Sequence, residues 1–188
     1  MILEKHYFIL ASQSPRRKIL LKTILPKFEI IASDINENAV SYKTPVEYCQ
    51  KVARLKALNV SDKLKKLNKT AIIISADTIV VLGNKIYGKP ENATAAKDYI
   101  IELSGKIHQV ITAFTILDSA NEKLIEDYEI SEVCIKKMDN SEIEEYIQNA
   151  DWHDKAGGYA IQDMKKYQSN SSEIQNQKPG KSNFDIVE

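Results

Sequence analysis

The first part of the chain alternates between apolar runs with strand character and apolar residues at helical spacing. Residues 7–11 form a short apolar run, and Ser14-Pro15 then offers an N-cap hydroxyl followed by proline at the first helical position. After Pro15, apolar residues repeat at helical spacing: Leu20, Leu21, Ile24 and Leu25. This pattern predicts a strand over 7–11 and a helix from Pro15 to about Pro26, with one apolar stripe.

The middle of the chain continues the alternation. A strand is predicted over 28–32, and Thr44-Pro45-Val46-Glu47 has the form of a capping box that opens a helix to about Ser61. Residues 62–69 are charged and predict a solvated connection. The run AIIISADTIVVL, residues 71–82, is typical of a strand buried on both faces, and Gly83-Asn84 predicts a hairpin into a strand over 85–87.

The later part is richer in hairpins. A helix is predicted from Asn92 to Gly105, long strands over 107–117 and 123–136, and a second helix from the capping-box pattern Ser141-x-x-Glu144 to Asn149. A last strand is expected over 159–162, and residues 163–188 predict a weakly ordered polar tail. The expected fold is α/β with a mixed, twisted sheet.

Composition narrows the class of protein. The 188 residues suit one domain over 1–162 followed by the tail, and the 26 basic and 26 acidic residues leave no net field toward nucleic acid or anionic membrane. The two cysteines have no paired spacing, which argues against a disulfide framework or a zinc cluster. The same spacing of the cysteines favours a reducing, cytoplasmic setting, and no apolar run has the length of a membrane span. A nucleic-acid binder using SPRRK is a weak alternative, since no basic face extends it.

Two groups of residues invite a chemical interpretation. Arg16, Arg17 and Lys18 place three cations at the positive end of a helix dipole, which predicts an anion site shared with Ser12 and Ser14, although a solvated helix start is the simpler alternative. Asp77 ends a buried-looking run, where a carboxylate needs a partner.

The surroundings of Asp77 suggest what that partner does. Lys56 and Lys89 are expected to lie near Asp77, and a carboxylate among fixed cations is what metal-assisted phosphoryl chemistry needs. A structural aspartate that caps a turn remains the alternative. Each of the three histidines is expected to be structural.

Four ordered motifs then carry a family resemblance: LASQSPRRKILL, SADTIVVLGNKIYGKP, LSGKIHQVITAF and DKAGGYAIQ. Together they resemble the Maf family of nucleotide pyrophosphatases over about residues 7–162. The resemblance implies hydrolysis of a nucleoside triphosphate to the monophosphate and pyrophosphate with Mg²⁺ or Mn²⁺. It also implies a curved mixed sheet flanked by helices, two lobes around a cleft, and a homodimer.

The resemblance also implies roles for residues at matching positions. By the resemblance, Asp77 is expected to be the catalytic carboxylate and to bind the metal with Glu37, and Lys56 and Lys89 to bind substrate. The anion site at the helix start adds Ser12 and Arg17 to the expected substrate-binding residues. Arg16, Thr78 and Gln162 match the branch that acts on dTTP and UTP rather than on 7-methyl-GTP.

The chain departs from the family after Gln162. There the family continues with a Gly-rich turn, a strand, a Val-Gly-Leu-Pro segment and a closing helix, whereas this chain has the polar tail. The departure motivates a second hypothesis, a catalytically impaired nucleotide-binding or regulatory relative linked to cell division.

Overall fold

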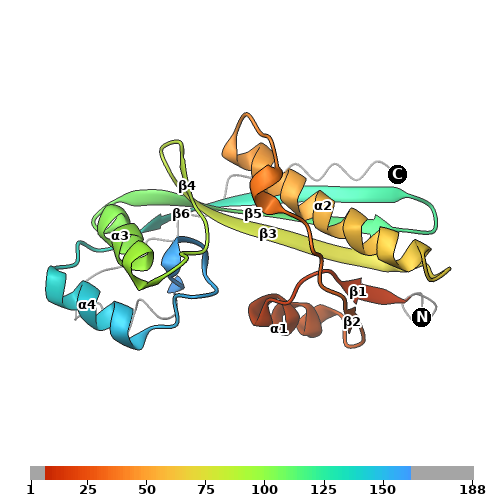
Figure 1. The fold of residues 1–188 in the computed structure, drawn as a ribbon, viewed down its shortest axis with the longest axis horizontal. Coiled ribbons are helices and arrows are strands. Elements are labelled where there is room, and N and C mark those ends of the chain that lie inside the picture. The colour runs from red at the N-terminus through yellow and green to blue at the C-terminus, as the bar shows by residue number, and fades with distance from the viewer. Residues whose placement is uncertain (1–6, 162–188) are drawn as a thin grey trace. The chain divides into compact units, whose positions relative to one another are not determined.

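The computed structural model describes residues 7–161, which fold into a mixed α/β structure (Figure 1). The strands are β1 (Phe8–Leu10), β2 (Glu29–Ile30), β3 (Ile72–Leu82), β4 (Lys85–Tyr87), β5 (Ile107–Asp118) and β6 (Lys123–Cys134). The helices are α1 (Pro15–Ile24), α2 (Pro45–Lys65), α3 (Ala93–Leu103) and α4 (Asn140–Asn149), with 3-10 turns η2 (Glu37–Ala39) and η3 (Ala156–Gly158).

The six strands form one sheet in the order β2-β1-β3-β5-β6, with β4 paired to β3. β1 runs parallel to both β2 and β3, whereas β4 is antiparallel to β3. The mixed sheet flanked by helices confirms the predicted fold class. The cleft between two lobes stays a prediction.

The described residues divide into two compact units. The first comprises residues 7–78 and 112–128, and the second comprises 79–111 and 129–161, so the division falls within β3, β5 and β6. Each unit has its own core.

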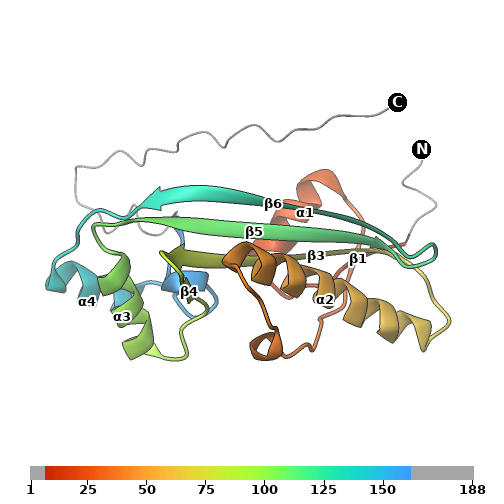
Figure 2. The ribbon, with the colours of Figure 1, turned by 90° about the horizontal axis from the view of Figure 1, so that it is seen from above.

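In the first unit, helices cover both faces of the sheet (Figures 1 and 2). One face packs Ile9 and Ile73 against Ala57, Val60 and Leu64 of α2. The other face packs Leu10 and the partly buried Ile74 against Leu21 and Leu25 of α1. Neighbouring residues of β1 and β3 therefore serve opposite faces, as the two-residue period of a strand requires.

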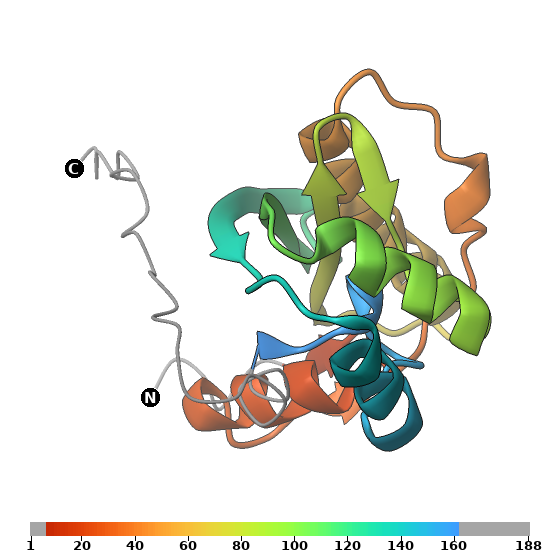
Figure 3. The same ribbon diagram turned by 90° about the vertical axis from the view of Figure 1, so that its left-hand side faces the viewer.

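In the second unit, α3, α4 and η3 lie side by side (Figure 3). Their buried residues join those of β4 and β6 in one core cluster, which includes Tyr87, Ile100, Val133, Tyr146 and Tyr159. Gly157 and Gly158 both have positive φ in η3, where glycine avoids the steric cost that a Cβ would add.

Three helix predictions need correction. Ser14 occupies the N-cap of α1, but its side chain makes no cap hydrogen bond, and α1 buries Leu21 and Leu25 while Leu20 and Ile24 stay exposed. α2 continues to Lys65 because Leu64 is buried against the sheet, so the charged connection is shorter than expected. These outcomes reflect tertiary packing, which local pattern does not report.

The two predicted capping boxes also differ in detail. At α2, Thr44 Oγ1 accepts from the Glu47 N–H as expected, but the Glu47 carboxylate accepts from the Lys43 N–H. At α4, the reciprocal box is formed by Asp139 and Glu142, and Ser141 lies inside the first turn. Asp139 is the better N-cap because its carboxylate accepts from both the Ser141 hydroxyl and the Glu142 N–H.

The predicted strand over 159–162 is wrong for its described part. Tyr159 and Ala160 are not in a strand, because the Tyr159 ring is anchored in the second core and its hydroxyl bonds His108. Gln162 and the predicted tail over 163–188 lie outside the described residues.

Three further observations bear on the sequence expectations. Both cysteines lack a disulfide bond, and His108 is a buried structural residue. Within residues 7–161, no helix is long and apolar enough to cross a membrane.

The buried His108 predicts a pH dependence of stability. Its Nε2 lies 2.5 Å from the Tyr159 hydroxyl and its Nδ1 lies 3.4 Å from the Lys106 carbonyl, so Nδ1 carries the hydrogen and Nε2 accepts from Tyr159. Burial lowers the pKa of His108. The unfolded chain therefore binds a proton at a higher pH than the folded protein does, and stability falls as pH drops below about 6.5.

This prediction is tested by measuring the free energy of unfolding between pH 5 and pH 7.5. His108→Gln should flatten the decline, because glutamine takes up no proton in this range. An unchanged decline in His108→Gln would assign it to another group.

Candidate functional site

Asp77 lies in β3 on the face that α2 covers. Burial alternates along this part of the strand, so Ile73, Ser75 and Asp77 are buried on one side. The Ser75 hydroxyl donates to the Ala53 carbonyl of α2 at 2.7 Å, which fixes the helix against the strand. One helical turn further along α2, Lys56 is thereby placed opposite Asp77.

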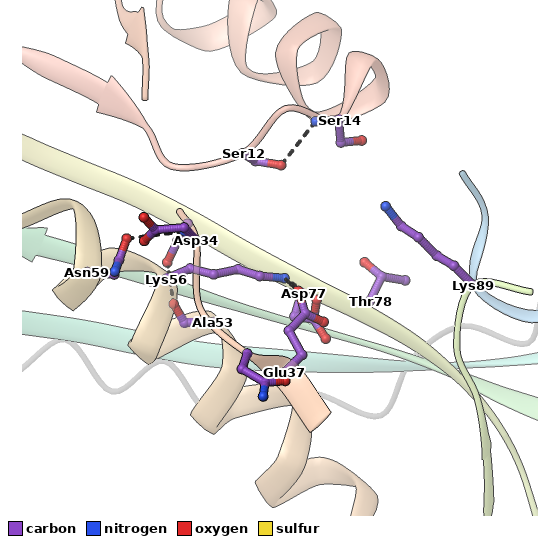
Figure 4. A network of polar contacts seen from close by, with 12 residues as sticks. Ser12, Ser14, Asp34, Glu37, Ala53, Lys56, Asn59, Asp77, Thr78 and Lys89 are labelled. Atoms are coloured by element: carbon purple, nitrogen blue, oxygen red, sulfur yellow. Dashed lines mark hydrogen bonds and ion pairs between the residues drawn. The ribbon is translucent and has the colours of Figure 1, made fainter. Parts of the chain in front are cut away.

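The Lys56 ammonium joins two carboxylates. Its Nζ lies 2.7 Å from Asp77 Oδ1 and 2.9 Å from Glu37 Oε1 (Figure 4). Glu37 arrives from η2, which Asn36 begins by accepting the Asn38 N–H on its side chain. Three segments distant in sequence thus meet at one buried cation.

Burial dominates the electrostatics of Asp77. The residue is only 6% exposed, and desolvation raises the pKa of its carboxyl group, with a further upward contribution from Glu37. Lys56 and Arg17 act in the opposite direction by stabilising the carboxylate. A carboxylate with a raised pKa is better suited to accept a proton than an ordinary surface aspartate.

Of the three cations at the start of α1, Arg17 is the one that contacts the site. Its Nη1 donates to Ser12 Oγ at 3.4 Å and its Nη2 donates to Thr78 Oγ1 at 3.3 Å, while Arg16 and Lys18 are exposed. Burial lowers the pKa of Arg17, partly offset by Asp77 and Glu37. The guanidinium keeps its charge because its pKa starts far above neutrality.

The turn after β1 brings Ser12 to the Arg17 guanidinium. Ser12 Oγ also accepts from the Ser14 N–H at 3.2 Å, so the chain turns away from the sheet directly into α1. Ser12 follows the carboxyl end of the parallel strand β1, where open α/β sheets bind ligands. Arg17 contacts Ser12 and Thr78 and interacts electrostatically with Asp77 and Glu37, so these residues and Lys56 belong to one region of the first unit.

The remaining predicted site residues are placed differently. Lys89 belongs to the second unit, where its Nζ pairs with Asp154 Oδ1 at 2.5 Å and the lysine side chain stays 65% exposed. Arg16 is exposed on α1, and Gln162 lies outside the described residues. An exposed ion pair contributes little to stability, so Lys89 can exchange Asp154 for another anion at small cost.

The donor set fits a hard divalent cation in type but supplies few ligands. Among residues 7–161 there is no cluster of three or more His, Cys, Asp or Glu side chains able to hold a metal. Asp77 Oδ1 and Glu37 Oε1 meet at the Lys56 ammonium, so a cation would be bound through the second oxygen of each carboxylate. Mg²⁺ characteristically takes one or two carboxylates and completes its shell with water and substrate phosphates.

Two further residues bear on the site. Sequence reasoning missed Thr112 of β5, whose Oγ1 lies 3.1 Å from Thr78 Oγ1. Its only signal was the alternation in IHQVITAF, which places it on the strand face opposite Ile111 and Ala113. Cys49 is excluded as a nucleophile, because burial raises the pKa of its thiol to about 12.

The chain is similar in sequence to one family of known proteins. Residues 7–172 match the family model described as Maf-like protein. The dTTP/UTP pyrophosphatase of Alkaliphilus metalliredigens is 44% identical over 154 residues, covering 82% of this chain and 78% of the relative. That of Pyrococcus furiosus is 42% identical over 156 residues, covering 82% and 77%.

Among solved structures, the Ham1 protein of Staphylococcus aureus is similar with a TM-score of 0.44 and 18% identity, covering 70% of this chain and 74% of that one. The family assignment rests on the sequence matches alone. With the family model matching most of its length, the chain belongs to the Maf family.

Proposed function

We propose that this protein hydrolyses nucleoside triphosphates of the dTTP and UTP type to the monophosphate and pyrophosphate. The observation that carries the proposal is the buried Lys56 ammonium held between Asp77 and Glu37, beside an Arg17 aimed at hydroxyl groups. Relatives of more than 40% identity named dTTP/UTP pyrophosphatase support the same activity. They favour hydrolysis over the alternative of an inactive regulatory relative.

The phosphate chain would be bound by cations and hydroxyls of the first unit. Arg17 uses two of its five N–H donors on Ser12 and Thr78 within the described residues, which leaves three for phosphate oxygens. The first turn of α1, which contains no acidic residue, adds backbone N–H donors and Arg16. Lys89 of the second unit is the further cation in the proposal, together with Gln162 as a contact to the nucleotide.

Asp77 is the proposed acceptor for the proton of the attacking water, because burial raises its pKa and Lys56 keeps it oriented. Asp77 and Glu37 would hold the divalent cation, Mg²⁺ or Mn²⁺. When bound, the cation supplies charge neutralisation on the phosphate oxygens. Lys56 holds the two carboxylates together and, with Arg17, stabilises negative charge that grows on the phosphates.

Two further expectations from the family are retained as proposals. We expect a homodimer, to be checked by light scattering, and a cytoplasmic location. Neither is required for the chemistry proposed for the first unit.

The activity itself is tested by pyrophosphate release from dTTP, UTP, dCTP, ATP, GTP and 7-methyl-GTP, with Mg²⁺, with Mn²⁺ and with a chelator. We expect release from dTTP and UTP in the presence of metal and loss of release with the chelator. Absence of turnover for every nucleotide, from protein shown to be folded, would refute the enzyme proposal.

Asp77→Asn should abolish nearly all turnover while the fold is retained, because the amide keeps the size of the side chain but neither accepts the proton nor binds metal as a carboxylate does. Asp34→Asn is the matched control, since Asp34 is an exposed carboxylate of the same unit that pairs with Lys63. Turnover of Asp77→Asn within a few-fold of the wild type would make Asp77 structural.

Arg17→Lys should lower kcat/KM by about 10–100-fold, because lysine keeps the charge but loses the planar fork that Ser12 and Thr78 orient. In Arg16→Lys the charge of an exposed side chain is kept, and the effect should stay within a few-fold. Comparable losses in both variants would mean that Arg17 contributes charge without orientation.

A further inference from the structure

A chain of hydroxyl groups leads away from Arg17 into the sheet. Arg17 Nη2 donates to Thr78 Oγ1 at 3.3 Å, and Thr78 Oγ1 lies 3.1 Å from Thr112 Oγ1. Thr78 is in β3 and Thr112 is in β5, the neighbouring strand of the sheet. All three residues belong to the first unit.

The available hydrogens restrict how this chain is wired. A guanidinium only donates, so Thr78 Oγ1 accepts from Arg17. Between the two threonines, either the Thr78 hydroxyl donates to Thr112 Oγ1 or the Thr112 hydroxyl donates to Thr78 Oγ1. In both cases the Thr112 hydroxyl fixes the side-chain torsion of Thr78, and hence the position of the oxygen that Arg17 meets.

The distances indicate that Arg17 depends on this support. Its bonds to Ser12 and Thr78, at 3.4 and 3.3 Å, are longer than the usual N–H···O distance of about 2.9–3.0 Å. Two weak bonds orient a guanidinium only if their acceptors are themselves held in place. Ser12 Oγ is held by its hydrogen bond from the Ser14 N–H, and Thr78 Oγ1 is held by its hydrogen bond with Thr112 Oγ1.

The position of Thr112 in the sheet does not by itself explain its hydroxyl group. It is partly buried on β5, while its chain neighbours Ile111 and Ala113 are buried on the opposite face. A valine would fill the same space and suit the strand equally well. A hydroxyl at this position is therefore not demanded by the packing of the sheet.

We propose that Thr112 is a positioning residue for the triphosphate, acting through Thr78 to orient the Arg17 guanidinium. The proposal rests on the proposed function, because it concerns the anion that Arg17 binds. Thr112 does not itself need to touch the substrate.

The test compares Thr112→Val, which removes the hydroxyl, with Thr112→Ser, which keeps it. Thr115→Val is the matched control, because Thr115 lies on the same strand and its hydroxyl donates instead to Glu126. The variants Thr78→Val and Thr78→Val/Thr112→Val complete a double-mutant cycle. For each protein, KM and kcat for dTTP are measured, together with the rise in thermal midpoint caused by a non-hydrolysable dTTP analogue.

Thr112→Val should raise KM by about 3–10-fold, the scale of one neutral hydrogen bond, with a smaller decrease in kcat because Arg17 also stabilises the transition state, and should reduce the rise caused by the analogue. Thr112→Ser and Thr115→Val should resemble the wild type. In the Thr78→Val background, loss of the Thr112 hydroxyl should have no further effect.

Three results would overturn the inference while the wild type is active: an unchanged KM in Thr112→Val, an equal loss in Thr115→Val, or the same loss in the Thr78→Val background. A wild type that neither hydrolyses nor binds any triphosphate would instead refute the proposed function, and this inference with it.

Discussion

The arrangement of the first unit depends on one buried cation, the ammonium of Lys56. Asp77 and Glu37 would repel each other at short range, and Asp77 is almost fully removed from water. Lys56 contacts both carboxylates and is itself only 8% exposed. The buried pair of Lys56 and Asp77 is tolerated only while both partners are present, because removal of one leaves an uncompensated buried charge, and the half-exposed Glu37 gives Lys56 a second partner.

This constraint explains why the surrounding elements are placed as they are. Ile73, Ser75 and Asp77 of β3 face α2, so the apolar contacts of Ile73 and the hydrogen bond from Ser75 to α2 set the register that brings Lys56 to Asp77. η2 adds Glu37 from a loop. Thr78, one residue further, faces the side of α1 and engages Arg17. Adjacent residues of a single strand thus serve a carboxylate site and a guanidinium.

Sequence reasoning predicted the elements well and the contacts only in part. Asp77 was recognisable because a carboxylate ended a run of apolar residues, and the cations at α1 because they opposed the helix dipole. The bond from Lys56 to two carboxylates was not predictable, since it depends on the register of α2 against β3. Thr112 was missed because a threonine in a strand has no distinctive pattern, and the strand at Tyr159 was mistaken because its apolar residues are held by side-chain contacts instead of a ladder.

The central claim, that Lys56 is what allows the Asp77 carboxylate to lie buried beside Glu37, is tested most directly by unfolding free energies in metal-free buffer. Lys56→Met should lose about 3–5 kcal/mol relative to the wild type, the usual cost of breaking a buried pair. The double variant Lys56→Met/Asp77→Asn should recover a large part of that loss, because it removes one of the unpaired charges. Equal stability of wild type and Lys56→Met, or no recovery in the double variant, would contradict the account.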